Sequence, residues 1–336
     1  MHALYYAGIL RLLQAIRLRR RAVVLMYHRV LTAEQQRQVG SNPGIVISRD
    51  TFVRQMACVK RGFKVLSLEQ FAQQIRERKP FADSSCLITF DDGWHDNFEN
   101  AWPVLKEASL PAVIFLPVNY IGSTRSFWRE TLTRLLVHIL HDVRRQPQRR
   151  AAYDDILANA GLVSVLDISD ADPRSAINEA LEPLKRRGIE DVNAVIGALA
   201  AAAGVSVATL TKADRLMDWS QVEAMSQDGI AFGGHGAEHR LLGQIREDEI
   251  DGEVTAMTAE MNARLATPAP AISYPNGSWT PAVIERVKRA GFQLGFTTQP
   301  GTVSVDDEPL TIRRVNISED MTRTRAMFLA RILGVL

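Results

Sequence analysis

Residues 86–93 read CLITFDDG, an apolar run that ends in two adjacent aspartates and a glycine. The run is typical of a buried strand, and the aspartates and glycine are typical of the turn that follows one. Residues 229–239 read GIAFGGHGAEH, so that two histidines, four positions apart, also follow an apolar run. In α/β sheets and barrels, functional sites lie at the carboxyl ends of the strands. The two stretches therefore predict an α/β fold in which carboxylates and imidazoles meet at one end of the strands.

The residue types in these two stretches also predict a chemistry. One carboxylate and two imidazoles form a three-ligand set that leaves a divalent metal open to water and substrate. The second carboxylate is then free to act as a base. Taken alone, an Asp-Asp-Gly is more often a simple turn, and a pair of histidines is more often solvated. The conjunction of the two favours a metal-assisted hydrolase.

The same residues resemble the first two signature motifs of the polysaccharide deacetylase family (carbohydrate esterase family 4, the relatives of chitooligosaccharide deacetylases). The motifs are TFDDG at residues 89–93 and His235-x-x-x-His239, and the flanking LMYHRV at 25–30 and ISYPNG at 272–277 extend the likeness. The resemblance covers roughly residues 22–124 and 215–316. It implies an α/β fold, a distorted, incomplete (β/α) barrel, with the site at the carboxyl ends of its strands.

By matching position, the resemblance implies a role for four side chains. Asp91 corresponds to the general base that activates the attacking water. Asp92, His235 and His239 correspond to the metal ligands. The expected metal is Zn²⁺, although Co²⁺, Ni²⁺ or Fe²⁺ would accept the same ligands.

The chain departs from the family pattern in two places. Many members carry an arginine that braces the catalytic aspartate just before the third motif, where this chain has Ser273. Many also end in a segment whose histidine is the general acid, whereas residues 310–315 read LTIRRV. His28, after the first expected strand, is then the candidate proton donor, or else a structural histidine in a turn. Arg313 or Arg314 brings positive charge to the site, or is solvated.

Four residues are candidates for binding the substrate. Trp94 follows the aspartate turn directly, and Tyr274, Pro275 and Asn276 belong to the third motif. Aromatic faces pack well against pyranose rings, so Trp94 and Tyr274 are candidate platforms for a sugar. The alternative for both is a place in the barrel core.

We therefore predict a metal-dependent N-deacetylase that hydrolyses the acetamido group of an amino sugar. The expected substrate is a bacterial polysaccharide, a glycan or a lipid-linked glycan precursor of exopolysaccharide or envelope synthesis, an expectation that rests on family analogy. Two alternatives stay open: a catalytically degenerate family member that binds glycan, and an amidohydrolase that acts on a non-sugar amide.

Expected strands and helices alternate in residues 22–124 and 215–320, which predicts that these residues form the barrel. Residues 125–214 interrupt the alternation of strands and helices and predict a mostly helical insertion, which is a lid, a docking surface or the cover of a barrel edge. Residues 246–266 predict a long amphipathic helix whose acids face solvent. Strands are expected at 23–27, 87–90, 112–116, 271–274, 293–297 and 310–315.

The two ends of the chain carry apolar residues at helical spacing beside arginines. In residues 1–21 the basic region follows the apolar stretch, which is the reverse of a secretory signal. This segment, and residues 321–336, predict basic amphipathic helices that contact a membrane surface or pack against the barrel. We expect a cytoplasmic protein, peripheral on the inner membrane. The formal net charge of +2 gives no signal for nucleic acid.

Overall fold

The computed structural model describes residues 8–335, and these divide into two compact units. The first unit contains residues 8–32, Gly44–Ser123 and 216–335. The second contains Ala33–Pro43 and Thr124–Arg215. The sequence predicted a helical insertion over 125–214, but it did not assign residues 33–43 to it.

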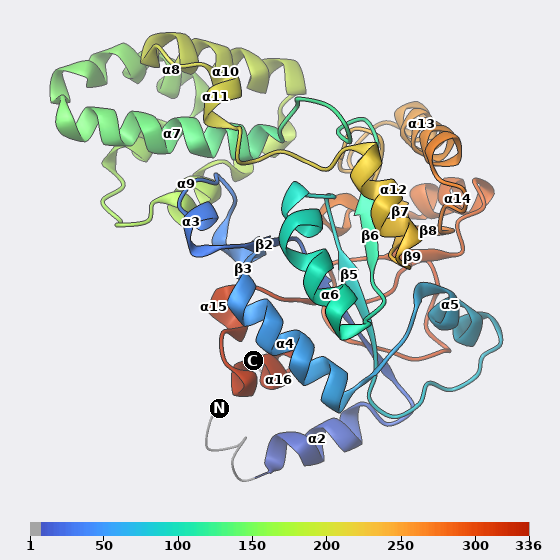
Figure 1. Cartoon of the computed structure of the whole chain (residues 1–336). Helices are drawn as coiled ribbons and strands as arrows, with labels where there is room; N and C mark the ends of the chain where they lie inside the picture. Colours follow the sequence, from blue (N-terminus) through green and yellow to red (C-terminus); the bar gives the residue numbers. More distant parts are fainter. Residues whose placement is uncertain (1–7, 336) are drawn as a thin grey trace. The chain divides into compact units, whose positions relative to one another are not determined.

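The first unit is built on a mixed sheet of nine strands within the described residues (Figure 1). Its central strands run parallel in the order β1-β5-β6-β7-β8-β9. Strand β10 pairs antiparallel with β1, while β11 pairs parallel with β1 and β4 with β5. The strands are β1 Ala22–Tyr27, β4 Lys64–Val65, β5 Ser85–Phe90, β6 Val113–Leu116, β7 Ala231–Gly234, β8 Ala271–Ser273, β9 Leu294–Phe296, β10 Thr302–Val303 and β11 Val315–Asn316; β2 Arg29–Leu31 and β3 Val46–Ser48 form a separate parallel pair.

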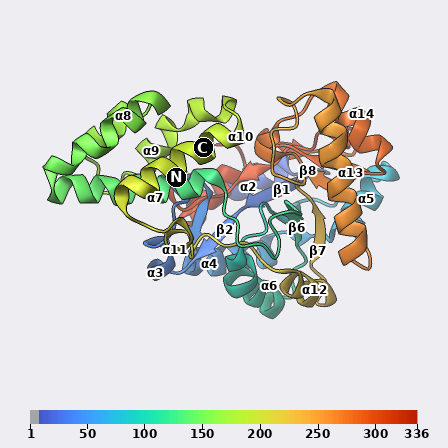
Figure 2. The same ribbon diagram turned by 90° about the horizontal axis from the view of Figure 1, so that it is seen from above.

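Helices lie around this sheet, as the two views in Figures 1 and 2 show. They are α2 Ile9–Arg17, α4 Arg49–Gly62, α5 Leu68–Arg76, α6 Trp102–Ala108, α12 Trp219–Gln227, α13 Glu247–Arg264, α14 Pro281–Arg289, α15 Glu319–Thr322 and α16 Arg325–Ile332. Short turns of other helix types are η1 Pro43–Ile45, at the border of the two units, η2 Asn97–Ala101 and η6 Pro275–Gly277. Because helices cover the sheet, β1, β5 and β6 are buried at every residue.

One short segment links the two edges of the curved sheet. Ile312 forms a parallel bridge with Phe296 of β9, and Val315 pairs with Leu25 of β1 three residues later. The sequence predicted a continuous strand here, but only Val315 and Asn316 form one, because the segment must cross from one edge to the other. The prediction of a distorted, incomplete (β/α) barrel is confirmed.

The second unit is helical and has a core of its own. Helix α7 turns an apolar stripe of Leu132, Leu135, Leu136 and Ile139 into this core, where it meets residues of α10 such as Leu199. The elements are α3 Ala33–Gln36, α7 Trp128–Arg145, η3 Pro147–Arg150, α8 Ala151–Ala160, η4 Val163–Asp167, α9 Arg174–Ala180, η5 Glu182–Arg186, α10 Ile189–Ala203 and α11 Val207–Leu210.

The two chain ends differ in what they expose. Helix α2 covers part of the N-terminal segment predicted to be helical, and residues 1–7 lie outside the described residues. The C-terminal segment forms α15 and α16, and Phe328, Leu329 and Ile332 are buried in the first unit. Buried apolar side chains in the described part of residues 321–336 therefore pack against the first unit, which is the second of the two alternatives predicted for this segment. Among the described helices, none combines the length and apolar character needed to span a bilayer.

Candidate active site

The signature residues meet at the carboxyl ends of three strands of the sheet, β5, β7 and β8. Asp91 and Asp92 follow β5 directly, His235 follows β7, and Ser273 ends β8. The turn after β5 is held in a left-handed conformation, with φ of 74° at Asp92 and 66° at Gly93. Aspartate tolerates this region better than most residues, and at Gly93 a Cβ atom would come within 2.7 Å of the Leu116 side chain. The Asp-Asp-Gly sequence thus sets the direction of both carboxylates.

Asp92, His235 and His239 form a compact group of ligand atoms. Asp92 Oδ1 lies 3.3 Å from His235 Nε2 and 3.2 Å from His239 Nε2. The three ligand atoms lie within 4.8 Å of one another. Tetrahedral ligands at about 2.0–2.1 Å from a zinc ion are themselves about 3.3 Å apart, so this donor set fits a divalent metal.

Hydrogen bonds to neighbouring groups orient two of these ligands. The Trp94 indole Nε1 donates to Asp92 Oδ2 at 2.9 Å, which leaves Oδ1 turned toward the histidines. His235 Nδ1 donates to the Ser273 carbonyl at 2.7 Å, so that its Nε2 points at the candidate metal position. Arg29 lies over the Trp94 ring, 4.1 Å from the ring centre. Such outer contacts fix the orientation of metal ligands.

Asp91 is held by a buried arginine from a distant part of the chain. Arg314 donates from Nη1 and Nη2 to the two carboxylate oxygens of Asp91, both at 2.7 Å. Ser273 completes the arrangement, because its hydroxyl donates to Asp91 at 3.2 Å and accepts from Arg314 at 2.8 Å. Arg314 is fully buried, while Arg313 is exposed. Of the two arginines that the sequence left open, Arg314 belongs to the site.

These contacts set the ionisation of the two aspartates. Burial by itself raises the pKa of Asp91, but the Arg314 guanidinium, with His235 and His28, holds that pKa below its ordinary value. Burial likewise raises the pKa of Asp92, yet hydrogen bonds from His235 and His239 hold it well below its usual range. Both carboxylates are therefore ionised at neutral pH, which suits a base beside a metal ligand.

Comparison with known proteins matches these residues to a family. The sequence model of the polysaccharide deacetylases matches residues 78–143 and 165–295, which is more than half of the chain. The chain belongs to the polysaccharide deacetylase family.

Individual relatives agree with this assignment. YxkH of Bacillus subtilis, described as a candidate polysaccharide deacetylase, is 19% identical over 300 residues, or 89% of this chain and 72% of YxkH. The poly-β-1,6-N-acetyl-D-glucosamine N-deacetylase of Staphylococcus epidermidis is 43% identical over 61 residues, or 18% of this chain and 21% of that protein.

Solved structures share the fold. IcaB of Ammonifex degensii superposes with a TM-score of 0.59 at 19% identity, covering 93% of this chain and 97% of that one. The Streptococcus pyogenes deacetylase PplD, solved with acetate, gives a TM-score of 0.58 at 17% identity, covering 93% and 98%.

His28 lies beside the base of this deacetylase site. Its Nε2 is 4.0 Å from Asp91 Oδ2, and its side chain is 14% exposed. Its Nδ1 is buried and has no hydrogen-bond partner among the described residues. Burial lowers the pKa of His28, against the opposing attraction of Asp92 and Asp91, so the ring is neutral at pH 7. His28 thus lies after β1 and beside Asp91, and its role as a proton donor stays a prediction.

The structure corrects the predicted sugar platform. Trp94 and Tyr274 are both fully buried, and the Tyr274 hydroxyl donates to the Leu310 carbonyl at 2.9 Å. Neither ring face is open to a sugar, so the prediction that they stack on substrate is wrong. Pro275 is also buried and lies close to Gly236 of the histidine loop, whereas Asn276 is exposed. Substrate contact by Asn276 stays a prediction.

Sequence reasoning missed Glu253, a buried acid of α13. Its Oε2 accepts from the backbone N–H groups of Ala237 at 2.8 Å and Glu238 at 3.0 Å. It thereby holds the loop between the two candidate histidine ligands. The prediction that the acids of this helix face solvent is wrong for Glu253, because acids occur all around α13 and no pattern sets this one apart.

Proposed function

We propose that this protein is a metal-dependent N-deacetylase that releases acetate from N-acetylated amino sugars of a bacterial polysaccharide or a lipid-linked glycan precursor. The observation that carries the proposal is the group Asp92, His235 and His239 beside an Asp91 carboxylate held by Arg314. Membership of the family and the printed names of the relatives support an acetamido substrate. A protein that only binds glycan would not need the complete set of ligands and base.

In this mechanism Asp92, His235 and His239 would hold the metal. A divalent metal in such a site polarises the amide carbonyl and lowers the pKa of water. Asp91 accepts a proton from the attacking water, since Arg314 keeps it ionised and fixes the direction of its oxygens. As the C–N bond breaks, the leaving amine takes up a proton. His28 is the candidate donor: its neutral ring would first take the proton that Asp91 accepted from water, because its Nε2 lies 4.0 Å from Asp91 Oδ2, and would then pass a proton to the amine.

The first test measures metal content and acetate release together. We expect about one equivalent of metal in the purified protein, lost in Asp92→Ala, His235→Ala and His239→Ala, with acetate released from β-1,6- or β-1,4-linked N-acetylglucosamine oligomers. A protein that takes up neither zinc nor cobalt on reconstitution contradicts the proposal and favours a degenerate glycan-binding protein. Turnover of simple amides but of no amino sugar would point instead to a non-sugar amidohydrolase.

A single substitution separates the base from the ligands. Asp91→Asn keeps the shape of the side chain but removes the proton acceptor, so metal content is retained and acetate release falls by about two orders of magnitude or more. Metal analysis and an acetate assay on the same preparation check this. Full activity of the variant would remove Asp91 from the mechanism.

A further inference from the structure

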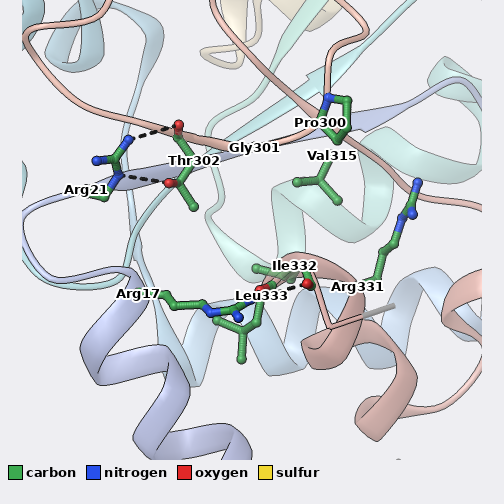
Figure 3. Close-up of a pocket in the computed structure, with 10 residues that line it drawn as sticks. Arg17, Arg21, Pro300, Gly301, Thr302, Val315, Arg331, Ile332 and Leu333 are labelled. Carbon is green, nitrogen blue, oxygen red and sulfur yellow. Dashed lines mark hydrogen bonds between the residues drawn. The ribbon is translucent and has the colours of Figure 1, made fainter.

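A pocket of about 430 Å³ lies away from the deacetylase site, beside the end of α2 and the end of α16 (Figure 3). Arg17, Arg21 and Arg331 line it together with uncharged residues such as Gly301, Val315 and Ile332, and no aspartate or glutamate is among the lining residues. Arg21 immediately precedes β1, whereas Asp91 bonds through its backbone N–H to Tyr27, the last residue of β1. The pocket and the candidate active site therefore lie at opposite ends of this strand.

Neutral groups hold the three arginines in place and leave their charge largely uncompensated. Arg17 donates to the Leu333 carbonyl, Arg21 Nε to the Thr302 hydroxyl at 2.8 Å, and Arg331 Nε to the Asn316 carbonyl at 3.2 Å. The one carboxylate that pairs with any of them in the described residues is Asp307, 3.9 Å from Arg21 and about half exposed. Each guanidinium has five N–H donors, so several remain for a ligand. A pocket of this kind selects an anion with several acceptor oxygens, such as a phosphate group.

Helix α2, whose last residue is Arg17, also carries a row of apolar side chains that residues 8–335 leave exposed. Ile9, Leu12 and Ile16 are 41%, 62% and 62% exposed, and their spacing puts them on one face. The helix contains no acidic residue, and Arg19 and Arg20 follow it. Apolar side chains in a row beside arginines are the pattern of a helix that lies in a membrane interface.

We propose that the pocket binds the phosphate of an anionic phospholipid headgroup while Ile9, Leu12 and Ile16 enter the acyl region beside it. The apolar row favours a lipid over a free phosphate, because a soluble ligand would leave that row exposed. The arginines favour an anionic surface over a neutral one, since each basic residue near such a surface contributes to binding. This surface contact does not depend on the deacetylase activity, which belongs to the other end of β1.

The test is flotation of the full chain with vesicles of phosphatidylcholine alone and with phosphatidylglycerol added. The pocket variant is Arg21→Gln with Arg331→Gln, and the row variant is Leu12→Gln with Ile16→Gln. The matched control is Lys288→Gln with Arg289→Gln, which removes the same charge from exposed positions on α14. Acetate release from a soluble oligomer shows that each variant is folded.

The proposal expects binding to the phosphatidylglycerol vesicles and little binding to phosphatidylcholine alone. It expects the pocket variant to lose about 25-fold in affinity, at about fivefold for each of its two arginines, and the control to lose much less. Equal losses of vesicle affinity in the pocket variant and the control would show a diffuse charge effect and overturn the proposed role of the pocket. If the wild type binds inorganic phosphate but not vesicles, the ligand is a free phosphate, and the proposal of a phospholipid ligand is overturned.

Discussion

At the residue scale, the site depends on how one buried carboxylate is kept charged. Asp91 is buried, and an isolated buried carboxylate favours its neutral form. Arg314 reverses this by contacting both oxygens, and its own Nε donates to the Thr297 carbonyl at 2.9 Å, which fixes the guanidinium. The brace that many family members place before the third motif is supplied here from the segment after β10.

Arg314→Gln should shift the pH dependence of the reaction. With the guanidinium present, the lowered pKa of Asp91 keeps the base ionised as the pH falls. Without it, burial acts unopposed, so the pKa rises and the acid limb of the kcat/KM profile moves to higher pH. Breaking the buried pair also costs stability, about 3–5 kcal/mol. The measurement is kcat/KM against pH, with the unfolding free energy of the same variant.

Two variants serve as controls for the arginine. Arg313→Gln removes the same charge from the exposed neighbour and should leave the profile unchanged. Arg314→Lys keeps the charge but loses the paired contact, and should fall between wild type and Arg314→Gln. An acid limb that does not move in Arg314→Gln would show that Asp91 does not set it.

The sequence allowed some of these residues to be predicted and not others, for a physical reason. Asp91, Asp92, His235 and His239 stand in short motifs next to apolar strands, so local pattern was enough. The pairing of Arg314 with Asp91 joins residues 223 positions apart, and nothing local distinguishes Arg314 from Arg313. Trp94 and Tyr274 were assigned to the wrong surface, because an aromatic residue after a strand looks the same whether its ring turns inward or toward substrate.

At the scale of elements, the loop after β7 shows how a strand end and a helix together position metal ligands. Gly236 and His239 both adopt positive φ, of 76° and 54°, so the loop turns back on itself between the two histidines. Glu253 of α13 accepts two of its backbone N–H groups. Without an acceptor these N–H groups would lose their partners inside the protein, which is costly. The long helix therefore acts on the site through the loop.

Glu253→Ala should weaken metal binding without removing a ligand. Loss of a contact that orients ligands typically costs 10- to 100-fold in metal affinity, and we expect a fall of about that size. Titration with zinc or cobalt measures it. Glu253→Gln retains an acceptor oxygen and should restore most of the affinity.

The control on the same helix is Glu260→Ala, which removes only a surface pair with Arg264. Its metal affinity should equal that of the wild type. Unchanged affinity in Glu253→Ala, in a protein that is folded by circular dichroism, would show that the loop keeps its shape without this helix.

At the scale of the whole molecule, the sequence predicted the barrel better than its partition into units. Alternating strands and helices indicated the barrel, and the interruption of this alternation at residues 125–214 indicated the helical insertion. Residues 33–43 were missed because a short segment gives no periodic pattern, and its place in the second unit follows from contacts with residues far along the chain. The cytoplasmic location stays a prediction.

The division of the chain into two compact units predicts how metal removal changes the stability of each unit. All three candidate ligands, and the residues that orient them, belong to the first unit. A ligand that binds only the folded state at 100 times its Kd stabilises it by about 2.7 kcal/mol, which for a unit of this size raises Tm by roughly 5–10 °C. Zinc should therefore raise the unfolding temperature of the first unit and leave that of the helical second unit unchanged. Differential scanning calorimetry of the full chain, with chelator and then with zinc, measures both transitions. Zinc should not shift the unfolding temperature of Asp92→Ala. An equal shift of both transitions in the wild type would mean that the two units unfold as one.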